Sequence, residues 1–209
     1  MSEIVVAPLF EQDGDGAAPM TPAALHMCRI GVDKAMELNR AWHSVFPTTN
    51  KGNLVRNRRK AFLGWEYKNR WWAVAIWTCP IAGNRLSGGP FLELRRFAIA
   101  PNCPPNTASY LLSTMRKDIR QQHPDVVALI SYQDTEQHAG TIYKAGNWAI
   151  ATKQLKFISW GNRKRNAEQT HSPKVRWVFP LRKSLNATCL PDAPAPVGVS
   201  QEHTLEVAP

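Results

Sequence analysis

The middle of the chain carries the pattern that most limits its fold. Residues 91–100 and 126–132 are strand-like apolar runs, and residues 106–122 between them have apolar side chains at helical spacing. That helical face carries Ala108, Leu111, Leu112, Met115 and Ile119. Prolines at 104, 105 and 124 bracket the segment, as is common at helix ends. A strand, a helix and a second strand in this order predict a β-α-β unit with parallel strands.

The flanking segments extend this unit into a larger mixed sheet. A short run at 24–30 leads to Asp33, a favourable N-cap for a first helix. Aromatic-rich strands at 61–67 and 71–78 form a hairpin, and a last helix at 136–145 ends at Gly146 in a C-cap position. Final strands are predicted at 149–159 and 175–181. The fold class is therefore α/β (α+β mixed), with a central mixed twisted sheet of six to seven strands flanked by helices.

Charge is concentrated in the central part of the chain. The net charge is +10, but residues 1–22 and 184–209 carry seven acidic residues and neither lysine nor arginine. Residues 23–183 therefore hold all 26 Lys and Arg against 9 Asp and Glu, a net charge of +17. We expect one folded domain over 23–183 that binds a polyanion or an anionic ligand. Both ends lack periodic apolar residues, so 1–22 and 184–209 are predicted to be disordered segments.

Neither a membrane segment nor a cysteine framework is evident. The longest apolar runs are too short to cross a bilayer, and no stretch at the start of the sequence has the pattern of a signal peptide, so we expect a cytoplasmic protein. Its four cysteines are far apart and form no Cys-x-x-Cys pair, which indicates free thiols.

Several sequence blocks resemble known families. The element order, together with Tyr143-Lys144-Ala145-Gly146-Asn147-Trp148, resembles the GNAT acyltransferase fold and its "aromatic-x-x-Gly-aromatic" element with one inserted residue. A more specific resemblance is to the phage Mom family, a GNAT-like branch. It runs through Leu92-Glu93-Leu94-Arg95-Arg96, Asn106-Thr107-Ala108-Ser109, Met115-Arg116-Lys117-Asp118-Ile119, Ile130-Ser131-Tyr132-Gln133-Asp134-Thr135 and Gly140-Thr141-Ile142-Tyr143-Lys144.

The Mom resemblance implies an enzyme that modifies phage DNA. It would convert the N6 amine of adenine to a carbamoylmethyl derivative, N6-carbamoylmethyladenine, and so protect the DNA from restriction. Double-stranded DNA and a small-molecule donor would be its partners, in the cytoplasm of the host cell. GNAT enzymes hold the pyrophosphate of coenzyme A with a glycine-rich loop, whereas Pro104 and Pro105 here remove two amide donors. The donor is therefore not identified, and a coenzyme A donor is disfavoured.

Four residues are candidates for catalysis. Asp134 follows the 126–132 strand, where ligands bind in open α/β sheets, and could accept a proton from the adenine amine or cap the next helix. Tyr143 could protonate a leaving group or simply fill the core. Arg96 alternates with Leu92 and Leu94 on an apolar face, opposite Glu93, which points to an anionic partner such as the donor or Asp134. The resemblance gives Ser109 a site role, although a capping role would also explain it.

Cofactor sites follow mainly from the resemblance. Asn106, Thr107 and Ser109 begin the 106–122 helix, and free backbone amides at 107–109 could hold an anion. The Mom family has been linked to iron, and imidazole with carboxylate suits that metal. The resemblance therefore makes His43, Asp134 and His138 a candidate iron site.

Basic and aromatic residues together suggest a nucleic-acid surface. The candidates for binding DNA are Arg56, Arg58, Arg59, Lys60, Tyr132, Arg163, Lys164 and Arg165. Tryptophans at 65, 71, 72, 160 and 177 are near these cations in sequence and could stack on bases, or could fill the sheet core. Two rival functions stay open, an N-acyltransferase that uses acyl-coenzyme A on a protein or small amine, and a non-catalytic DNA-binding domain. The oligomeric state is open as well, a homodimer included.

Overall fold

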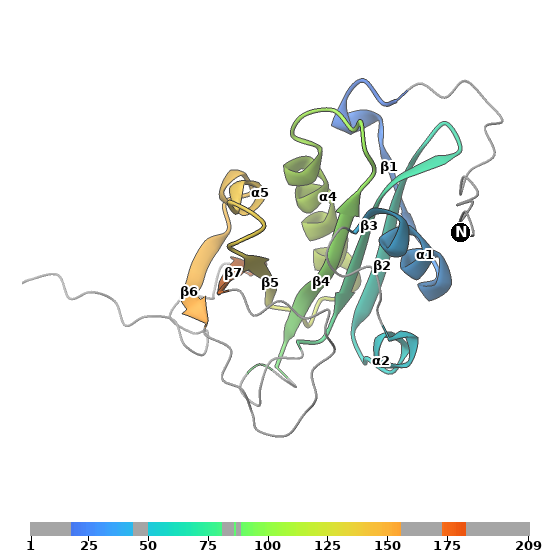
Figure 1. Ribbon diagram of the computed structural model, residues 1–209. Helices are drawn as coiled ribbons and strands as arrows, with labels where there is room; N and C mark the ends of the chain where they lie inside the picture. The colour runs from blue at the N-terminus through green and yellow to red at the C-terminus, as the bar shows by residue number, and fades with distance from the viewer. Residues whose placement is uncertain (1–17, 44–49, 81–85, 87–88, 156–172, 183–209) are drawn as a thin grey trace, which may run out of the picture.

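A computed structural model describes residues 18–43, 50–80, 86, 89–155 and 173–182. Within these residues the chain forms one seven-stranded sheet in the order β1-β2-β3-β4-β5-β7-β6 (Figure 1). The strands are β1 (His26–Arg29), β2 (Lys60–Tyr67), β3 (Arg70–Thr78), β4 (Phe91–Ile99), β5 (Ala128–Asp134), β6 (Ala149–Leu155) and β7 (Lys174–Pro180). The predicted α/β class and the predicted number of strands are confirmed.

Helices cover the two faces of the sheet (Figure 1). They are the 3-10 turn η1 (Pro22–Ala24) and the α-helices α1 (Val32–Trp42), α2 (Lys51–Val55), α4 (Thr107–Gln122) and α5 (Thr141–Ala145). The buried side of α4 packs in the largest core cluster, whereas α1 and α2 pack against residues of β3 and β4 in a separate cluster. Among the described residues, no helix has the length and apolar character needed to cross a bilayer.

The hairpin and the crossover are both formed as the sequence predicts. Lys68 and Asn69 have φ values of 49° and 59°, a conformation of two-residue turns that follows the twist of the strands they join. Helix α4 carries the chain from β4 to β5, and these two strands are parallel. All other neighbouring strands are antiparallel.

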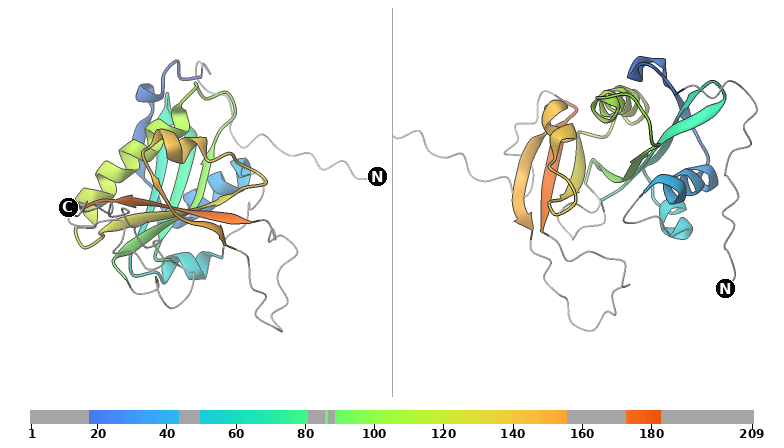
Figure 2. Two further views of the ribbon diagram at one scale, coloured as in Figure 1. Left: turned by 90° about the vertical axis from the view of Figure 1, so that its left-hand side faces the viewer. Right: turned by 45° about the horizontal axis from the view of Figure 1, so that its top comes forward.

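The sheet divides at this parallel junction. Strands β4 and β5 pair only from Phe91 to Leu94 and from Ala128 to Ser131. Beyond these residues the two strands separate, and Figure 2 shows β5, β7 and β6 turned away from β1 to β4. The carboxyl ends of two parallel strands therefore lie on either side of an opening in the sheet.

Two predicted details are wrong, and one open alternative is decided. Helix α1 has Gly31 as its N-cap, so Asp33 lies in the first turn, where its charge still favours the helix. The predicted helix at 136–145 is helical only from Thr141, because residues 135–137 form a turn and Gly140 has a φ of 72°. For the tryptophans, the alternative that they fill the sheet core is confirmed at four positions, because Trp65, Trp72 and Trp177 are buried in the core and Trp71 packs against the α1 side.

Other predictions lie outside the described residues. These are the terminal segments, apart from residues 18–22, the end of the predicted 149–159 strand, Trp160, and the basic loop with Arg163, Lys164 and Arg165. The domain boundaries at 23 and 183 stay predictions.

Candidate functional site

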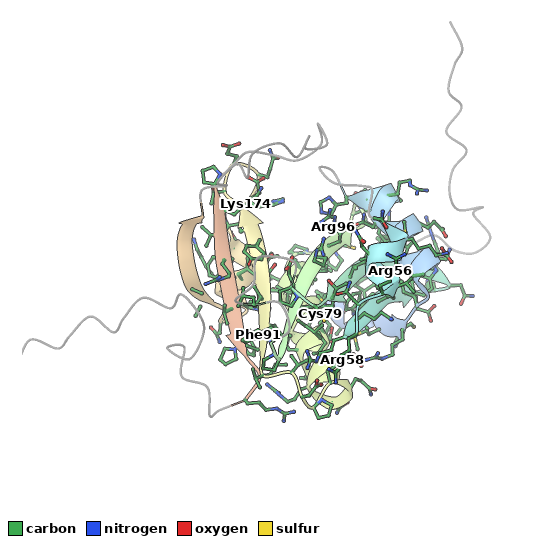
Figure 3. All side chains as sticks on the ribbon, turned by 90° about the horizontal axis from the view of Figure 1, so that it is seen from below. Arg56, Arg58, Cys79, Phe91, Arg96 and Lys174 are labelled. Atoms are coloured by element: carbon green, nitrogen blue, oxygen red, sulfur yellow. The ribbon has the colours of Figure 1, made fainter. Side chains whose placement is uncertain are left out.

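A cavity of about 570 Å³ opens where β4 and β5 separate. One wall comes from the second half of β4 and the end of α1, and another comes from the end of β5 and residues 137–143. Six of the predicted functional residues line this one cavity, namely Asp134, Tyr143, Arg96, Tyr132, His43 and His138. Figure 3 shows Arg96 and Lys174 toward the same end of the sheet, with Phe91 and Arg58 toward the opposite end.

Tyr143 lies on the inner wall of the cavity. Its ring stacks on Trp177 at 5.3 Å and meets Trp148 edge-on at 5.6 Å, and the residue is 9% exposed. Its hydroxyl shares a hydrogen bond of 2.8 Å with the Ser131 hydroxyl. Burial raises the pKa of the Tyr143 phenol, and the bond to Ser131 opposes this only in part. The phenol is therefore protonated near neutral pH, so it can donate a proton at the cavity surface.

Asp134 at the end of β5 contacts Lys174 and the backbone of Glu136. Its side chain forms an ion pair with Lys174, its cross-strand neighbour on β7. Its Oδ1 accepts a hydrogen bond of 3.1 Å from the Glu136 amide. This bond closes a turn rather than capping the predicted helix. The Asp134 and Lys174 side chains are only 12% and 14% exposed, so a carboxylate and an ammonium group stand together in the cavity wall.

A β-bulge changes the predicted setting of Arg96. Ile76 pairs with Arg96 and Trp77 with Leu94, so Arg95 is an extra residue in β4. Leu94 and Phe97 thus pack on the same cluster, and Arg96 does not continue the face of Leu92 and Leu94. The predicted separation of Arg96 from Glu93 is therefore wrong.

The bulge gathers three charged side chains in the cavity wall. Glu93 forms an ion pair of 3.3 Å with Arg95, and its charge also acts on Arg96. Burial and the neighbouring Arg95 lower the pKa of Arg96 to about 10, against the opposing effect of Glu93. Arg96 is thus still a cation at neutral pH, and its Nη1 donates a hydrogen bond of 2.6 Å to the Arg95 carbonyl.

His43 and His138 both line the cavity. Burial, followed by the charges of Arg96 and His138, lowers the pKa of His43 to about 4, so this imidazole is neutral at pH 7. The predicted iron ligands do not fit a metal, because the Lys174 ammonium group lies against the Asp134 carboxylate and would repel a metal cation there. Within the described part of the chain, no three His, Cys, Asp or Glu side chains are grouped to hold a metal ion. We derive no step through iron.

The start of α4 contributes fewer residues to the cavity than the sequence predicts. The Thr107 hydroxyl donates to the Pro104 carbonyl at 2.6 Å and the Ser109 hydroxyl donates to the Asn106 carbonyl at 3.0 Å. The Thr107 amide also bonds to Pro104, so it is not free to hold an anion as predicted. From this first turn of the helix, Ala108 lines the cavity, and Asn106, Thr107 and Ser109 do not.

The predicted DNA-binding cluster lies away from the cavity. Arg59 forms an ion pair of 2.5 Å with Asp125, and Lys60 donates to the Val55 carbonyl at 2.7 Å, so both side chains hold local structure. Arg56 and Arg58 are exposed. Tyr132 is the one member of this predicted set, among those described, that lines the cavity.

Sequence reasoning missed several residues of the cavity. Trp42 comes from the end of α1, Lys174 from the start of β7, and Gln133 and Ser131 from β5. Gln133 and Ser131 could have been found, because strand alternation places these two polar side chains on one face, near the carboxyl end of the strand where ligands bind. Trp42 and Lys174 come from distant segments, and neither has a sequence signal that points to the site.

The amino-acid sequence of the chain matches a known protein family. A model of the Mom protein family matches residues 81–186, just over half of the 209 residues. The chain belongs to the Mom protein family. The matched stretch contains β4, α4, β5, α5 and β7, and so most of the cavity wall, whereas Trp42 and His43 precede it. No curated protein sequence matches the chain.

Solved structures show that this Mom family member has the GNAT fold. The ribosomal-protein-S18-alanine N-acetyltransferase of Escherichia coli has a TM-score of 0.54 at 12% identity and covers 78% of this chain and 99% of its own. A GNAT family acetyltransferase of Elizabethkingia anophelis with bound acetyl-CoA has a TM-score of 0.52 at 10% identity, with coverages of 75% and 98%. The spermidine N-acetyltransferase of Vibrio cholerae, in complex with CoA and spermine, has a TM-score of 0.53 at 10% identity, with coverages of 76% and 96%. The predicted GNAT-like fold is confirmed.

Proposed function

We propose that this protein modifies the N6 amine of adenine in double-stranded DNA by transferring a carbamoylmethyl group from a small-molecule donor. The observation that carries the proposal is the meeting of Asp134 and Tyr143 in one cavity at the carboxyl ends of two parallel strands. Ligands bind at this place in open α/β sheets. Membership of the Mom protein family supports the DNA substrate.

The two side chains divide the proton transfers. The adenine amine is a poor nucleophile, so it needs a nearby base as it attacks the donor. The Asp134 carboxylate takes the N6 proton while the N6–carbon bond forms and the bond between that carbon and its leaving group breaks. The Tyr143 phenol gives its proton to the leaving group. The Ser131 hydroxyl, which lies 2.8 Å from the Tyr143 hydroxyl, then passes a proton back to the Tyr143 phenolate.

The amine of a base-paired adenine is enclosed in the duplex, so the base must leave the stack before reaction. Tyr132 from β5 and Trp42 from α1 offer aromatic surfaces to an extruded purine from different walls of the cavity. Stacking on such a surface contributes about 1–3 kcal/mol per base. The strong positive charge of residues 23–183 supports binding of this domain to the phosphates of DNA.

A second candidate is an N-acyltransferase that takes its acyl group from coenzyme A. Its support is the fold, which this chain shares with structures that contain CoA or acetyl-CoA. The bonding of the Thr107 amide to Pro104 counts against a pyrophosphate site at the start of α4. Calorimetric titration with coenzyme A separates the two candidates, because the second requires tight binding in the absence of DNA.

Mass spectrometry of nucleosides from cells that express the chain tests the proposal. We expect carbamoylmethyladenosine in the DNA with the wild-type protein. With Asp134→Asn we expect at least about 100-fold less of it, which is the usual range for loss of a general base. Tyr143→Phe should reduce the product similarly, because it removes the phenolic proton.

Asp125→Asn is the matched control, since Asp125 also forms an ion pair with a basic residue, Arg59, but lies away from the cavity. It should leave the modification unchanged. Filter binding must show wild-type DNA affinity for Asp134→Asn. An unmodified deoxyadenosine pool with confirmed wild-type expression would refute the proposed function.

A further inference from the structure

Gln133 is a buried polar residue in the wall of the cavity. It lies on β5 between Tyr132 and Asp134 and is 7% exposed. Its Oε1 accepts a hydrogen bond of 2.7 Å from the indole Nε1 of Trp177. Its Nε2 donates a hydrogen bond of 2.5 Å to the carbonyl oxygen of His138. One side-chain amide thus connects β7 with the 135–140 segment.

Both groups that Gln133 binds support the cavity wall. Trp177 stacks on Tyr143 at 5.3 Å, with the two ring planes 19° apart. The 135–140 segment contributes the side chains of Gln137, His138 and Ala139 to the cavity. A shift of Gln133 therefore reaches the proposed proton donor on one side and this segment on the other.

The chemistry of the two partners requires an amide at position 133. An indole nitrogen can only donate a hydrogen bond and a carbonyl oxygen can only accept one. The side chain between them must accept and donate at the same time, and it must have the length of glutamine. An ionised carboxylate would still accept from Trp177 but would repel the His138 carbonyl.

Gly140 shows how closely this arrangement is packed. A Cβ added at Gly140 would overlap Gln133 Oε1 and would lie 2.9 Å from Trp177 Cζ2. The glycine also has a φ of 72°, a conformation that other residues adopt at a cost. The chain thus returns directly over the Gln133–Trp177 hydrogen bond on its way to α5.

We infer that Gln133 is a positioning residue that fixes Tyr143, through Trp177, and the 135–140 segment relative to Asp134. The inference rests on the proposed function for its effect on catalysis, although the contacts themselves can be tested without activity. Gln133 touches neither the adenine nor the donor in this account. It acts through the groups that do.

Gln133→Glu tests the two hydrogen bonds of Gln133 one at a time, because ionisation of the new side chain removes only one of them. While the new carboxyl group is protonated it can accept from Trp177 and donate to His138, as glutamine does. Once ionised it loses the second bond. The modification rate relative to wild type should therefore fall by about tenfold or more between about pH 6 and about pH 9, since small displacements of reacting groups cost at least that much.

Two readouts follow the contacts directly. Backbone amides of residues 138–140 should exchange with solvent faster in Gln133→Glu at high pH and at the wild-type rate at low pH. The indole N–H resonance of Trp177 should stay close to its wild-type position throughout. Gln133→Met, which keeps the length but loses both bonds, should shift that resonance and speed exchange at every pH.

Gln137→Glu is the matched control, because Gln137 lines the same cavity but is exposed. It adds the same charge and should not reproduce the pH-dependent loss. Wild-type exchange at 138–140 in both Gln133 variants overturns the inference. So does a pH profile of Gln133→Glu that matches Gln137→Glu while the wild type modifies DNA. If the wild type does not modify DNA, the proposed function fails, and the exchange and resonance data alone decide whether Gln133 holds the wall.

Discussion

Single residues in the cavity owe their properties mainly to burial. The Tyr143 phenol is kept protonated because its anion would be poorly solvated, and His43 is kept neutral for the corresponding reason. Asp134 is different, because Lys174 and the Glu136 amide both stabilise the charged carboxylate. A phenol and a carboxylate thus stand in the walls of one cavity, and a proton donor beside a carboxylate is the arrangement that acid–base chemistry needs.

The depressed pKa of His43 gives a test at this scale. In the unfolded chain the imidazole binds a proton below about pH 6.5, whereas in the folded protein it stays neutral down to about pH 4. The folded state therefore loses stability as the pH falls through this window. The full shift would correspond to about 3 kcal/mol, and solvent screening of this partly exposed group should reduce the effect to about 1–2 kcal/mol.

Urea unfolding of wild type and His43→Gln at pH 7 and pH 4.5 measures this effect. The unfolding free energy of wild type should fall more than that of His43→Gln over this range. His123, whose pKa is also lowered, contributes equally to both proteins and cancels in the comparison. Parallel losses in the two proteins would contradict the neutral state of His43.

At the scale of elements, the 135–140 segment shows where sequence reasoning fails. Its composition permits a helix, but three contacts prevent one from forming. The Asp134 side chain binds the Glu136 amide, Gln133 takes the His138 carbonyl, and Gly140 adopts a positive φ. The two hydrogen bonds are local contacts between side chain and backbone that compete with the helix, and a prediction from helical spacing does not take them into account. The bulge at Arg95 escaped prediction for a similar reason, because strand alternation assumes an unbroken ladder.

Gly140→Ala should disrupt this segment. The added methyl group would meet Gln133 and Trp177 and would have to adopt a φ of 72°, at a cost of about 1–3 kcal/mol. Differential scanning calorimetry measures the loss. Gly31→Ala is the comparison, because a methyl group there meets nothing within 4 Å and φ is −70°. Equal transition temperatures for the two variants would show that Gly140 is not constrained as described.

Across the whole molecule, the sequence predicted the architecture better than the site. Alternating apolar periods and prolines at 104, 105 and 124 identified the crossover helix and the parallel strands it joins. These signals are local, and the structure confirms them. The cavity depends on contacts between α1, β4, β5 and β7, which no local pattern encodes. Asp134, Tyr143 and Tyr132 were found through their strand and motif positions, whereas Trp42 and Lys174 were not.

The proposed interaction with DNA also belongs to this scale. Arg56 and Arg58 are exposed, so replacing both with glutamine should weaken DNA binding with little effect on folding. If each contacts a phosphate, the slope of log affinity against log salt should become less steep by about 2. Fluorescence anisotropy on a short duplex at several salt concentrations measures this slope.

Lys34→Gln with Lys117→Gln removes the same charge from α1 and α4 and is the control. A smaller effect on the slope is expected there. Equal slopes in the two double variants would mean that net charge alone governs binding, and that Arg56 and Arg58 are not phosphate contacts.

The opening between β4 and β5 has one more consequence. The cavity lies where the pairing of the two strands ends, after Leu94 and Ser131, so it follows from the course of the backbone. Any protein with this strand order and pairing should therefore have a cavity at this place, and the residues that line it determine which ligand binds. Substitutions of the residues that line the cavity can therefore change which substrate binds without changing the fold.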